Sequence, residues 1–302
     1  MSTPVDHDER MARSKLSLAG LSIGDAFGEQ FFRLPEVEYA IKSHYSPLPP
    51  WPYTDDTEMA LAIFEVLRQE GRVDQDALAI RFARRYAKNP GRGYGATALG
   101  ILESIGEGLY WREVSSAAFD GMGSMGNGGA MRVAPLGAYF ADDLKAVVEQ
   151  ARLSAEVTHA HAEGQAGAIA VAVAAAFAWN VRGKLTAQTG TQLFEYALAH
   201  TPPGETHDGI LKAAGLPRDL SVPTAVHHLG NGSRVISQDT VPFCLWCAAR
   251  HLDSYRDALW TTVSGLGDRD TTCAIVGGIV ALSAGEKTIP GEWLQAREPL
   301  QW

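Results

Sequence analysis

Apolar side chains recur at helical spacing along most of this 302-residue chain. The clearest case follows Asp55, where five apolar positions spaced i, i+3, i+4, i+7 and i+8 form one face of a helix: Met59, Ala62, Ile63, Val66 and Leu67. Gly71 stands where such a helix would stop in a left-handed cap. Asp74 can then cap a second helix, which ends at Asn89 before a proline.

The same spacing predicts further helices over residues 13–27, 96–105, 144–157, 163–179, 191–199, 222–229, 240–251, 254–263 and 271–283. Strict alternation of apolar and polar residues is nearly absent, and only residues 233–237 are a candidate for extended structure. Helices joined by short Gly- and Pro-rich loops are typical of an all-α fold. Because no low-complexity linker divides residues 1–302, we expect a single compact multi-helix domain.

Two predicted loops are unusually long. Residues 35–53 contain five prolines and several aromatic residues, and residues 120–136 contain the sequence GMGSMGNGGAMRVAPL. Long loops inside a compact domain are often functional. The stretch 123–129 offers many backbone N–H groups and few side chains, so it can cradle a diphosphate. The alternative is a flexible turn.

Composition narrows the partners and the location. The chain has 35 acidic and 26 basic residues, and the resulting charge of −9 argues against broad binding to nucleic acid or to an anionic membrane. The first residues lack the apolar core of a signal peptide, and the longest apolar run, residues 166–179, is shorter than a membrane span, so we expect a buried helix there. We expect a cytoplasmic protein without membrane contact, and a monomer.

The three cysteines cannot form a disulfide framework, which suits a reducing compartment. Two of them form the pattern Cys244-x-x-Cys247 in an apolar helical stretch. Because no second pair and no histidine at zinc spacing accompany them, we interpret them as buried thiols of the core.

Two short clusters combine carboxylates with hydroxyls where helices are expected to begin: Thr-Asp-Asp-Thr at 54–57 and Asp-Arg-Asp-Thr-Thr at 268–272. Helix capping is one explanation, with Thr54 or Asp55 as the cap and Glu58 completing a capping box, and with Asp270 capping the later helix. Capping accounts for one aspartate in each cluster and leaves the second unexplained. Since divalent cations offset the repulsion between carboxylates, the two clusters predict an oxygen-only dinuclear metal site if they meet in the fold.

The second cluster has two further features. Asp-x-Asp-x-Thr is also the phosphoryl-transfer motif of haloacid-dehalogenase-like enzymes, but that motif follows a buried strand, and none is expected before residue 268. Gly277 and Gly278 lie inside the helix that follows, where each costs about 1 kcal/mol relative to alanine. Close approach of another helix would account for both glycines.

Five motifs follow one another along the chain: GLSIGDAFG at 20–28, TDDTEMAL at 54–61, GNGGAMR at 126–132, Thr-His at 158–159 and GDRDT at 267–271. Each is weak alone, but their number and order are specific, and they span most of the chain. Together they resemble the ADP-ribosylglycohydrolase family, which includes dinitrogenase-reductase-activating glycohydrolase and the eukaryotic ADP-ribosyl-acceptor hydrolases.

The resemblance implies an all-α hydrolase that cleaves the glycosidic bond between ADP-ribose and an acceptor, which is a modified protein, a nucleic acid or a small molecule. It implies two divalent cations, Mg²⁺ or Mn²⁺, with Asp270 bridging both. The implied ligands are Thr54, Asp55, Asp56, Asp268, Asp270 and Thr271. Hard cations prefer such oxygen donors, and a metal lowers the pKa of bound water.

The resemblance also implies the residues that contact the substrate: Gly93, Tyr94, Gly95, Asn127, Gly128, Gly129, Met131, Arg132 and His159. For two of them a structural role is an equal alternative. Arg132 can bind phosphate or brace its loop, and His159 can contact substrate or only support the start of a helix. The stretch Trp51-Pro52-Tyr53 either lines the cleft or packs the segment that leads into the first cluster.

The sequence departs from the family at one position. Many members carry a glutamate that assists the attacking water, and Phe32 occupies that place here. Glu29, Asp55 and Asp56 are the candidates for the base. Two other functions therefore stay open: a non-catalytic ADP-ribose-binding or crystallin-like protein of the same fold, and a dinuclear nucleotide phosphohydrolase.

Overall fold

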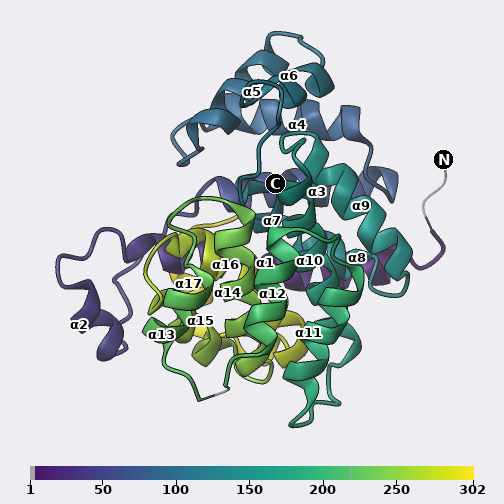
Figure 1. Cartoon of the computed structure of the whole chain (residues 1–302). Coiled ribbons are helices and arrows are strands. Elements are labelled where there is room, and N and C mark those ends of the chain that lie inside the picture. Colours follow the sequence, from purple (N-terminus) through teal and green to yellow (C-terminus); the bar gives the residue numbers. More distant parts are fainter. Residues whose placement is uncertain (1–3, 218) are drawn as a thin grey trace.

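The computed structural model describes residues 4–217 and 219–302 (Figure 1). Over these residues the chain is helical, and its only β structure is two isolated bridges. The first nine helices are α1 (His7–Gln30), α2 (Val37–Lys42), α3 (Asp55–Glu70), α4 (Gln75–Lys88), α5 (Ala96–Gly106), α6 (Trp111–Ala117), α7 (Gly128–Met131), α8 (Ala134–Tyr139) and α9 (Leu144–Glu156). The rest are α10 (Ala162–Asn180), α11 (Thr189–His200), α12 (Glu205–Ala214), α13 (Val222–Leu229), α14 (Ser237–Arg250), α15 (Tyr255–Val263), α16 (Arg269–Ala284), the 3₁₀ turn η1 (Glu286–Thr288) and α17 (Gly291–Ala296). The predicted all-α fold is confirmed.

The antiparallel pair α1 and α16 forms the centre of the fold, and glycines let the two helices touch (Figure 1). A Cβ atom added to three glycines of α1 would lie 2.1–2.4 Å from backbone carbonyl oxygens of α16: Gly20 against Gly277, Gly24 against Cys273 and Gly28 against Arg269. Gly278 faces α8, where an added Cβ would lie 2.8 Å from that of Ala134. The predicted close approach at both glycines of α16 is therefore confirmed. It brings the end of α1 beside the start of α16, where the second carboxylate cluster lies.

Helix α10 is buried on nearly all sides, by neighbours that include α8, α9, α14 and α16. By length and composition α10 is apolar enough to cross a membrane, but 78% of its apolar window is buried inside the fold. Alanine side chains let the neighbours pack closely from several directions. The prediction of a buried helix over residues 166–179 is confirmed.

The predicted caps around α3 and α4 are also found. α3 ends before Gly71, which adopts the left-handed conformation (φ +67°), and the side chain of Asp74 accepts a hydrogen bond from the backbone of Ala77 at the start of α4. α4 ends at Lys88, before Asn89. These signals worked because they depend on local backbone geometry.

Several short helices were not predicted from the sequence. α2 lies within the predicted loop 35–53, at the edge of the molecule in Figure 1, while α7 and α8 interrupt the predicted loop 120–136. α6, α12 and α17 were also missed. Helices this short show two or three turns of apolar spacing at most, and packing rather than intrinsic propensity stabilises them. The candidate extended stretch 233–237 contributes a single bridge, between Ile236 and Gly126.

The segment that leads into the first cluster is packed in an aromatic core. Trp51 is buried, with its ring centroid 5.7 Å from that of Phe27 and 6.0 Å from that of Trp293. Tyr53 is buried as well. Of the two alternatives for these aromatic residues, the structure shows that they pack this segment and do not line the cleft.

Candidate active site

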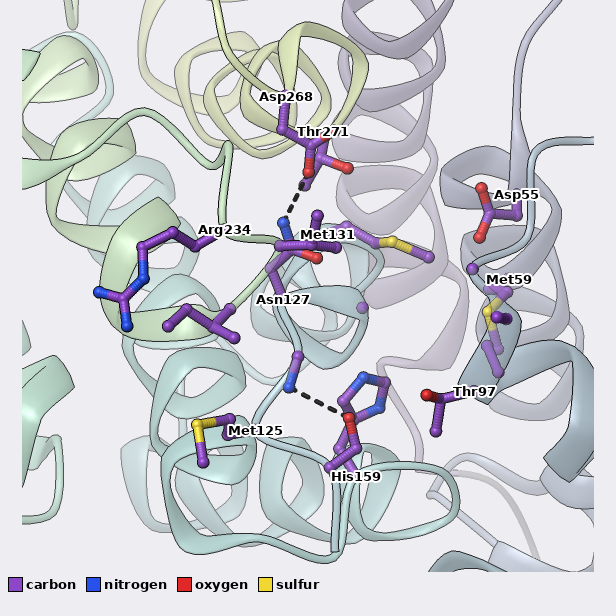
Figure 2. A pocket seen from close by; sticks show the side chains of 18 of the residues that line it. Asp55, Met59, Thr97, Met125, Asn127, Met131, His159, Arg234, Asp268 and Thr271 are labelled. Carbon is purple, nitrogen blue, oxygen red and sulfur yellow. Dashed lines mark hydrogen bonds between the residues drawn. The ribbon is translucent and has the colours of Figure 1, made fainter. Parts of the chain in front are cut away.

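One cavity of about 600 Å³ receives both carboxylate clusters (Figure 2). Asp55 borders it from the start of α3, while Asp268, Asp270 and Thr271 border it from the start of α16. The remaining wall includes Met59, Gly93 and residues 95–98, Phe119, the Gly-rich stretch 122–128 with Met131, His159 and the 234–236 segment. The structure therefore brings together two clusters that lie more than 200 positions apart in the sequence.

In the first cluster, the residue that caps the helix is Thr54 and not one of the two aspartates. Thr54 is the N-cap of α3, and its Oγ1 accepts from the backbone N–H of Asp56 at 3.3 Å and donates to the carboxylate of Asp56 at 2.8 Å. The predicted capping box is wrong, because the Glu58 carboxylate points away from the helix start to Arg85 (2.7 Å) and Asn89 (3.0 Å). Capping thus leaves both aspartates of this cluster available.

The second cluster begins at Asp268, the N-cap residue of α16, whose side chain makes no capping hydrogen bond. Its Oδ2 instead accepts from the side-chain amide of Asn127 at 2.7 Å, shown dashed in Figure 2. Asn127 also donates to the hydroxyl of Thr240 at 3.0 Å. The alternative that Asp270 caps the helix does not hold, because Asp270 lies one residue inside α16.

Burial and mutual repulsion disfavour charge on these aspartates. Burial, with help from the neighbouring Asp25, raises the pKa of Asp55 to about 7. The pKa values of Asp56 and Asp270 are also well above the ordinary range, first because of burial and then because of neighbouring carboxylates. Without a counter-charge, the site holds more carboxylate than it can keep ionised near neutral pH.

Asp25 belongs to this site, although the sequence reasoning did not place it there. It is fully buried in α1, and its carboxylate accepts from the backbone N–H groups of Thr54 (3.0 and 3.1 Å to its two oxygens) and Thr57 (3.1 Å), and from the Thr57 hydroxyl (2.5 Å). Burial raises its pKa to about 6. One feature of the sequence could have pointed to Asp25: on the predicted helix it is a carboxylate within GLSIGDAFG, whose other residues are small or apolar.

The donor types suit hard divalent cations. The Oδ1 atoms of Asp56 and Asp270 are buried and have no hydrogen-bond partner, which is costly unless a cation lies nearby. Carboxylates and threonine hydroxyls are the ligands that Mg²⁺ and Mn²⁺ prefer. Within residues 4–217 and 219–302, no three His, Cys, Asp or Glu side chains are already grouped as a metal cluster. Ions would therefore have to draw the carboxylates inward by side-chain rotation.

The predicted substrate residues divide into two groups. Gly93, Gly95, Asn127, Gly128, Met131 and His159 line the cavity. Tyr94 and Gly129 do not. The Tyr94 ring packs edge-on against Tyr86, with centroids 5.1 Å apart, and Gly129 faces Ala155 and Gly164.

Arg132 does not reach the cavity. It is fully buried, and its guanidinium lies 4.4 Å from the centre of the Phe82 ring and donates to the Ser154 carbonyl (3.1 Å) and to the Thr158 hydroxyl (2.8 Å). These contacts favour the loop-bracing alternative for Arg132 over a phosphate contact. Burial lowers its pKa to about 9.

His159 lies in the turn between α9 and α10, and not at a helix start as expected. Its Nδ1 is 2.7 Å from the Thr158 hydroxyl, which already accepts from Arg132. The single hydroxyl hydrogen is thus available to Nδ1, an assignment that leaves the ring proton on Nε2. Because burial lowers the pKa of His159 to about 3, the ring is neutral near pH 7. His159 can therefore donate one hydrogen bond from Nε2.

The end of α1 places no glutamate at the cavity. Glu29 forms an ion pair with Arg33 at 2.8 Å and is not among the lining residues. Phe32 is exposed, and the Arg269 guanidinium lies 4.3 Å from the centre of its ring. The structure gives no support to Glu29 as the base. Of the three predicted bases, Asp55 lines the cavity and Asp56 is buried beside it.

Some lining residues were not identified from the sequence. They are Thr97 and its neighbours at the start of α5, the apolar residues Phe119 and Met122, and the 234–236 segment, whereas Ser124 and Met125 belong to the predicted 123–129 stretch. Apolar and small residues carry no chemical signal of their own, so only the fold shows that they face the site. Phe119, Met122 and Met125 give the cavity wall an apolar part.

The family sequence model described as ADP-ribosylglycohydrolase matches residues 6–302, nearly the whole chain. The chain belongs to the ADP-ribosylglycohydrolase family. Within this family the haloacid-dehalogenase alternative falls away, because α15 and a turn precede Asp268 where that motif requires a strand.

Similar proteins cover nearly the whole chain. ADP-ribosylhydrolase ARH3 of Homo sapiens is 30% identical over 335 residues, which cover 95% of this chain and 90% of that protein. The ARH3 of Mus musculus is also 30% identical, with 95% and 88% covered. A solved structure named ADP-ribosylglycohydrolase-related protein complex matches with a TM-score of 0.65 at 26% identity, covering 96% of this chain and 94% of that chain.

Two cysteine predictions can also be compared with the structure. Cys244 and Cys247 lie on α14 and are fully buried, and burial raises the pKa of both thiols. Cys273 of α16 is buried too. The prediction of buried core thiols for Cys244 and Cys247 is confirmed, and Cys273 is a third free thiol.

Proposed function

We propose that this protein hydrolyses the glycosidic bond between ADP-ribose and an acceptor, with two divalent cations as cofactors. One observation carries the proposal. In a chain of the ADP-ribosylglycohydrolase family, both carboxylate clusters, two Gly-rich segments and a neutral histidine face the same cavity.

The ions would be held by Thr54, Asp55 and Asp56 on one side and by Asp268, Asp270 and Thr271 on the other. The carboxylate oxygens without hydrogen-bond partners support this assignment. When bound, such ions supply Lewis acidity and lower the pKa of water. Either Mg²⁺ or Mn²⁺ suits the oxygen donors.

The chain's own groups bind and orient the substrate. His159 can donate from Nε2 into the cavity. In the 123–128 stretch the backbone N–H groups of Gly123, Gly126 and Asn127 already donate within the protein, which leaves those of Ser124, Met125 and Gly128 for phosphate oxygens. Glycosidic cleavage develops positive charge at the anomeric carbon, which nearby carboxylates stabilise. Asp55 is the candidate base, because it lines the cavity and Glu29 does not.

A second candidate function is binding of ADP-ribose without hydrolysis. The specific observation in its favour is at the end of α1, where Phe32 replaces the expected glutamate and Glu29 is engaged by Arg33. The complete set of ligand-type residues speaks against it, because a binding protein gains nothing from several repelling carboxylates in its core.

The test is a turnover assay on a panel of ADP-ribosylated acceptors, including arginine, serine, a nucleobase and a small metabolite. Each is incubated with the protein and Mg²⁺, Mn²⁺ or a chelator, and free ADP-ribose is measured by chromatography. We expect release of ADP-ribose from at least one acceptor, dependent on added metal. Binding of ADP-ribose with no release on any acceptor would establish the second candidate, and release of AMP or phosphate would establish a phosphohydrolase.

A further inference from the structure

The first cluster is held from a distance by the C-terminal segment. The backbone N–H of Trp51 donates to the carbonyl of Ala296 at 2.7 Å, and that of Glu298 donates to the carbonyl of Trp51 at 3.0 Å. These bonds form the isolated parallel bridge between Trp51 and Arg297. The chain thus reaches Thr54 along a segment whose position is fixed by residues near its other end.

The Glu298 carboxylate and the Arg92 guanidinium together hold Tyr53. Oε1 of Glu298 accepts from the backbone N–H of Tyr53 at 2.9 Å and forms an ion pair with Arg92. Arg92 donates to the carbonyl of Tyr53 at 2.8 Å, and its guanidinium lies 4.1 Å from the centre of the Tyr53 ring. Both backbone groups of the residue before Thr54 are therefore bound by one ion pair.

Arg92 connects this ion pair to both sides of the cavity. Its carbonyl accepts from the backbone N–H of Asp55 at 2.8 Å. The residues that follow it include Gly93 and Gly95, which line the cavity. A displacement of Arg92 would therefore move the first cluster and the 93–95 loop together. Neither Arg92 nor Glu298 lines the cavity.

We propose that Glu298 is a positioning residue for Asp55 and for the 93–95 loop, acting through Arg92. The inference rests on the proposed function in one respect, because its first test measures binding of metal to the proposed metal site. It assigns to the C-terminal segment a part in the site, although this segment contributes no ligand. Partners that orient metal ligands change metal affinity by about 10- to 100-fold when removed.

The variants are Glu298→Ala, which removes the acceptor oxygen, and Glu298→Gln, which keeps an oxygen for Tyr53 and Arg92. The matched control is Asp142→Asn. Asp142 forms an ion pair with the buried Arg13, with 2.5 Å between the charged atoms, and neither residue lines the cavity. Two quantities are measured well below the melting temperature of every variant. They are the midpoint of Mn²⁺ binding by calorimetry, without substrate, and amide hydrogen exchange in peptides covering residues 51–57.

We expect Glu298→Ala to raise the Mn²⁺ midpoint by about tenfold and to speed exchange at Asp55. Glu298→Gln should recover most of both losses, and Asp142→Asn should leave both within about twofold of the wild type, the range usual for a surface ion pair. A lower melting temperature in Glu298→Ala with neither quantity changed would overturn the inference. Equal losses in the Gln and Ala variants would also overturn it, because they would indicate a role of charge alone.

Failure of the proposed function gives a different result. If the wild type binds neither Mn²⁺ nor Mg²⁺, the dinuclear hydrolase is excluded, and hydrogen exchange alone decides the role of Glu298. Faster exchange over residues 51–57 in Glu298→Ala, with no change in Asp142→Asn, then supports positioning of Asp55. Unchanged exchange overturns it.

Discussion

The two carboxylate clusters border the same cavity but are fixed in different ways. The first is held from behind by Asp25, whose carboxylate accepts from the backbone at Thr54 and Thr57. The second is held from the cavity side, because Asn127 of the Gly-rich stretch donates to Asp268. The first cluster is thus fixed by the core, while the second is bonded to a segment that lines the cavity. Substitutions around the first should affect the reaction itself, and those around the second should also affect substrate binding.

The largest loss of activity is expected from removal of a carboxylate from the second cluster. Asp270→Ala should lower kcat/KM by more than about a hundredfold, because it removes a carboxylate oxygen that has no protein partner. The metal-free variant should melt at a higher temperature than the wild type, since one of the repelling buried carboxylates is gone. Turnover and thermal unfolding measure the two effects, with the exposed Glu286→Ala as control. Turnover near that of the wild type would show that the second cluster is dispensable.

The next substitution tests the buried support of the first cluster. Asp25→Asn offers one oxygen where the aspartate offers two, and its amide group would face backbone donors. We expect kcat to fall by about 10- to 100-fold with little change in KM, and the Mn²⁺ midpoint to rise. Steady-state kinetics at saturating Mn²⁺ separate these quantities. A change confined to KM would mean that the first cluster is not set from the core.

A smaller effect on kinetics is expected from loss of the hydrogen bond that joins Asn127 of the Gly-rich stretch to Asp268. Asn127→Ala removes the donor to Asp268 and should raise KM by about tenfold, which corresponds to one charge-assisted hydrogen bond. Thr240→Val is the control, because it removes the other partner of Asn127 and a hydrogen bond to the Ile236 carbonyl (2.9 Å) but leaves the bond between Asn127 and Asp268. If kcat falls and KM does not change, the proposed coupling between this cluster and the substrate segment is wrong.

The smallest effect concerns pH. Burial raises the pKa of Asp55 to about 7 and raises the pKa values of Asp56 and Asp270 well above their ordinary range, so the folded metal-free protein holds protons that the unfolded chain releases above about pH 4. This contribution to stability is complete below about pH 4 and is lost as the pH rises through about 7. Added Mg²⁺ should therefore raise the melting temperature by more at about pH 8 than at about pH 5.5. An equal shift at both values would contradict a carboxylate metal site.

The sequence predicted most of the long helices, because apolar spacing and caps such as Gly71 are local signals. It also indicated that the two carboxylate clusters would form one metal site on condition that they meet, and the structure brings both to the same cavity. It did not reveal Asp25 as part of the site, because the bonds to Thr54 and Thr57 join α1 to α3 and leave no spacing pattern. Arg132 could not be assigned either. A motif arginine has the same letters whether it binds phosphate or, as here, braces a buried turn.

The close contact between α1 and α16 sets the spacing between the two carboxylate clusters, and with it the size of ion that fits between them. Asp25 on α1 supports the first cluster, α16 carries the second, and at Gly28 no side chain separates the two helices. A Cβ at Gly28 would lie 2.8 Å from the Cα of Asp270, so a single methyl group there would spread the two clusters. Ions held between them would then be selected by radius, with larger ones tolerated better than Mg²⁺. A residue that donates no ligand would thus determine which metal the protein accepts.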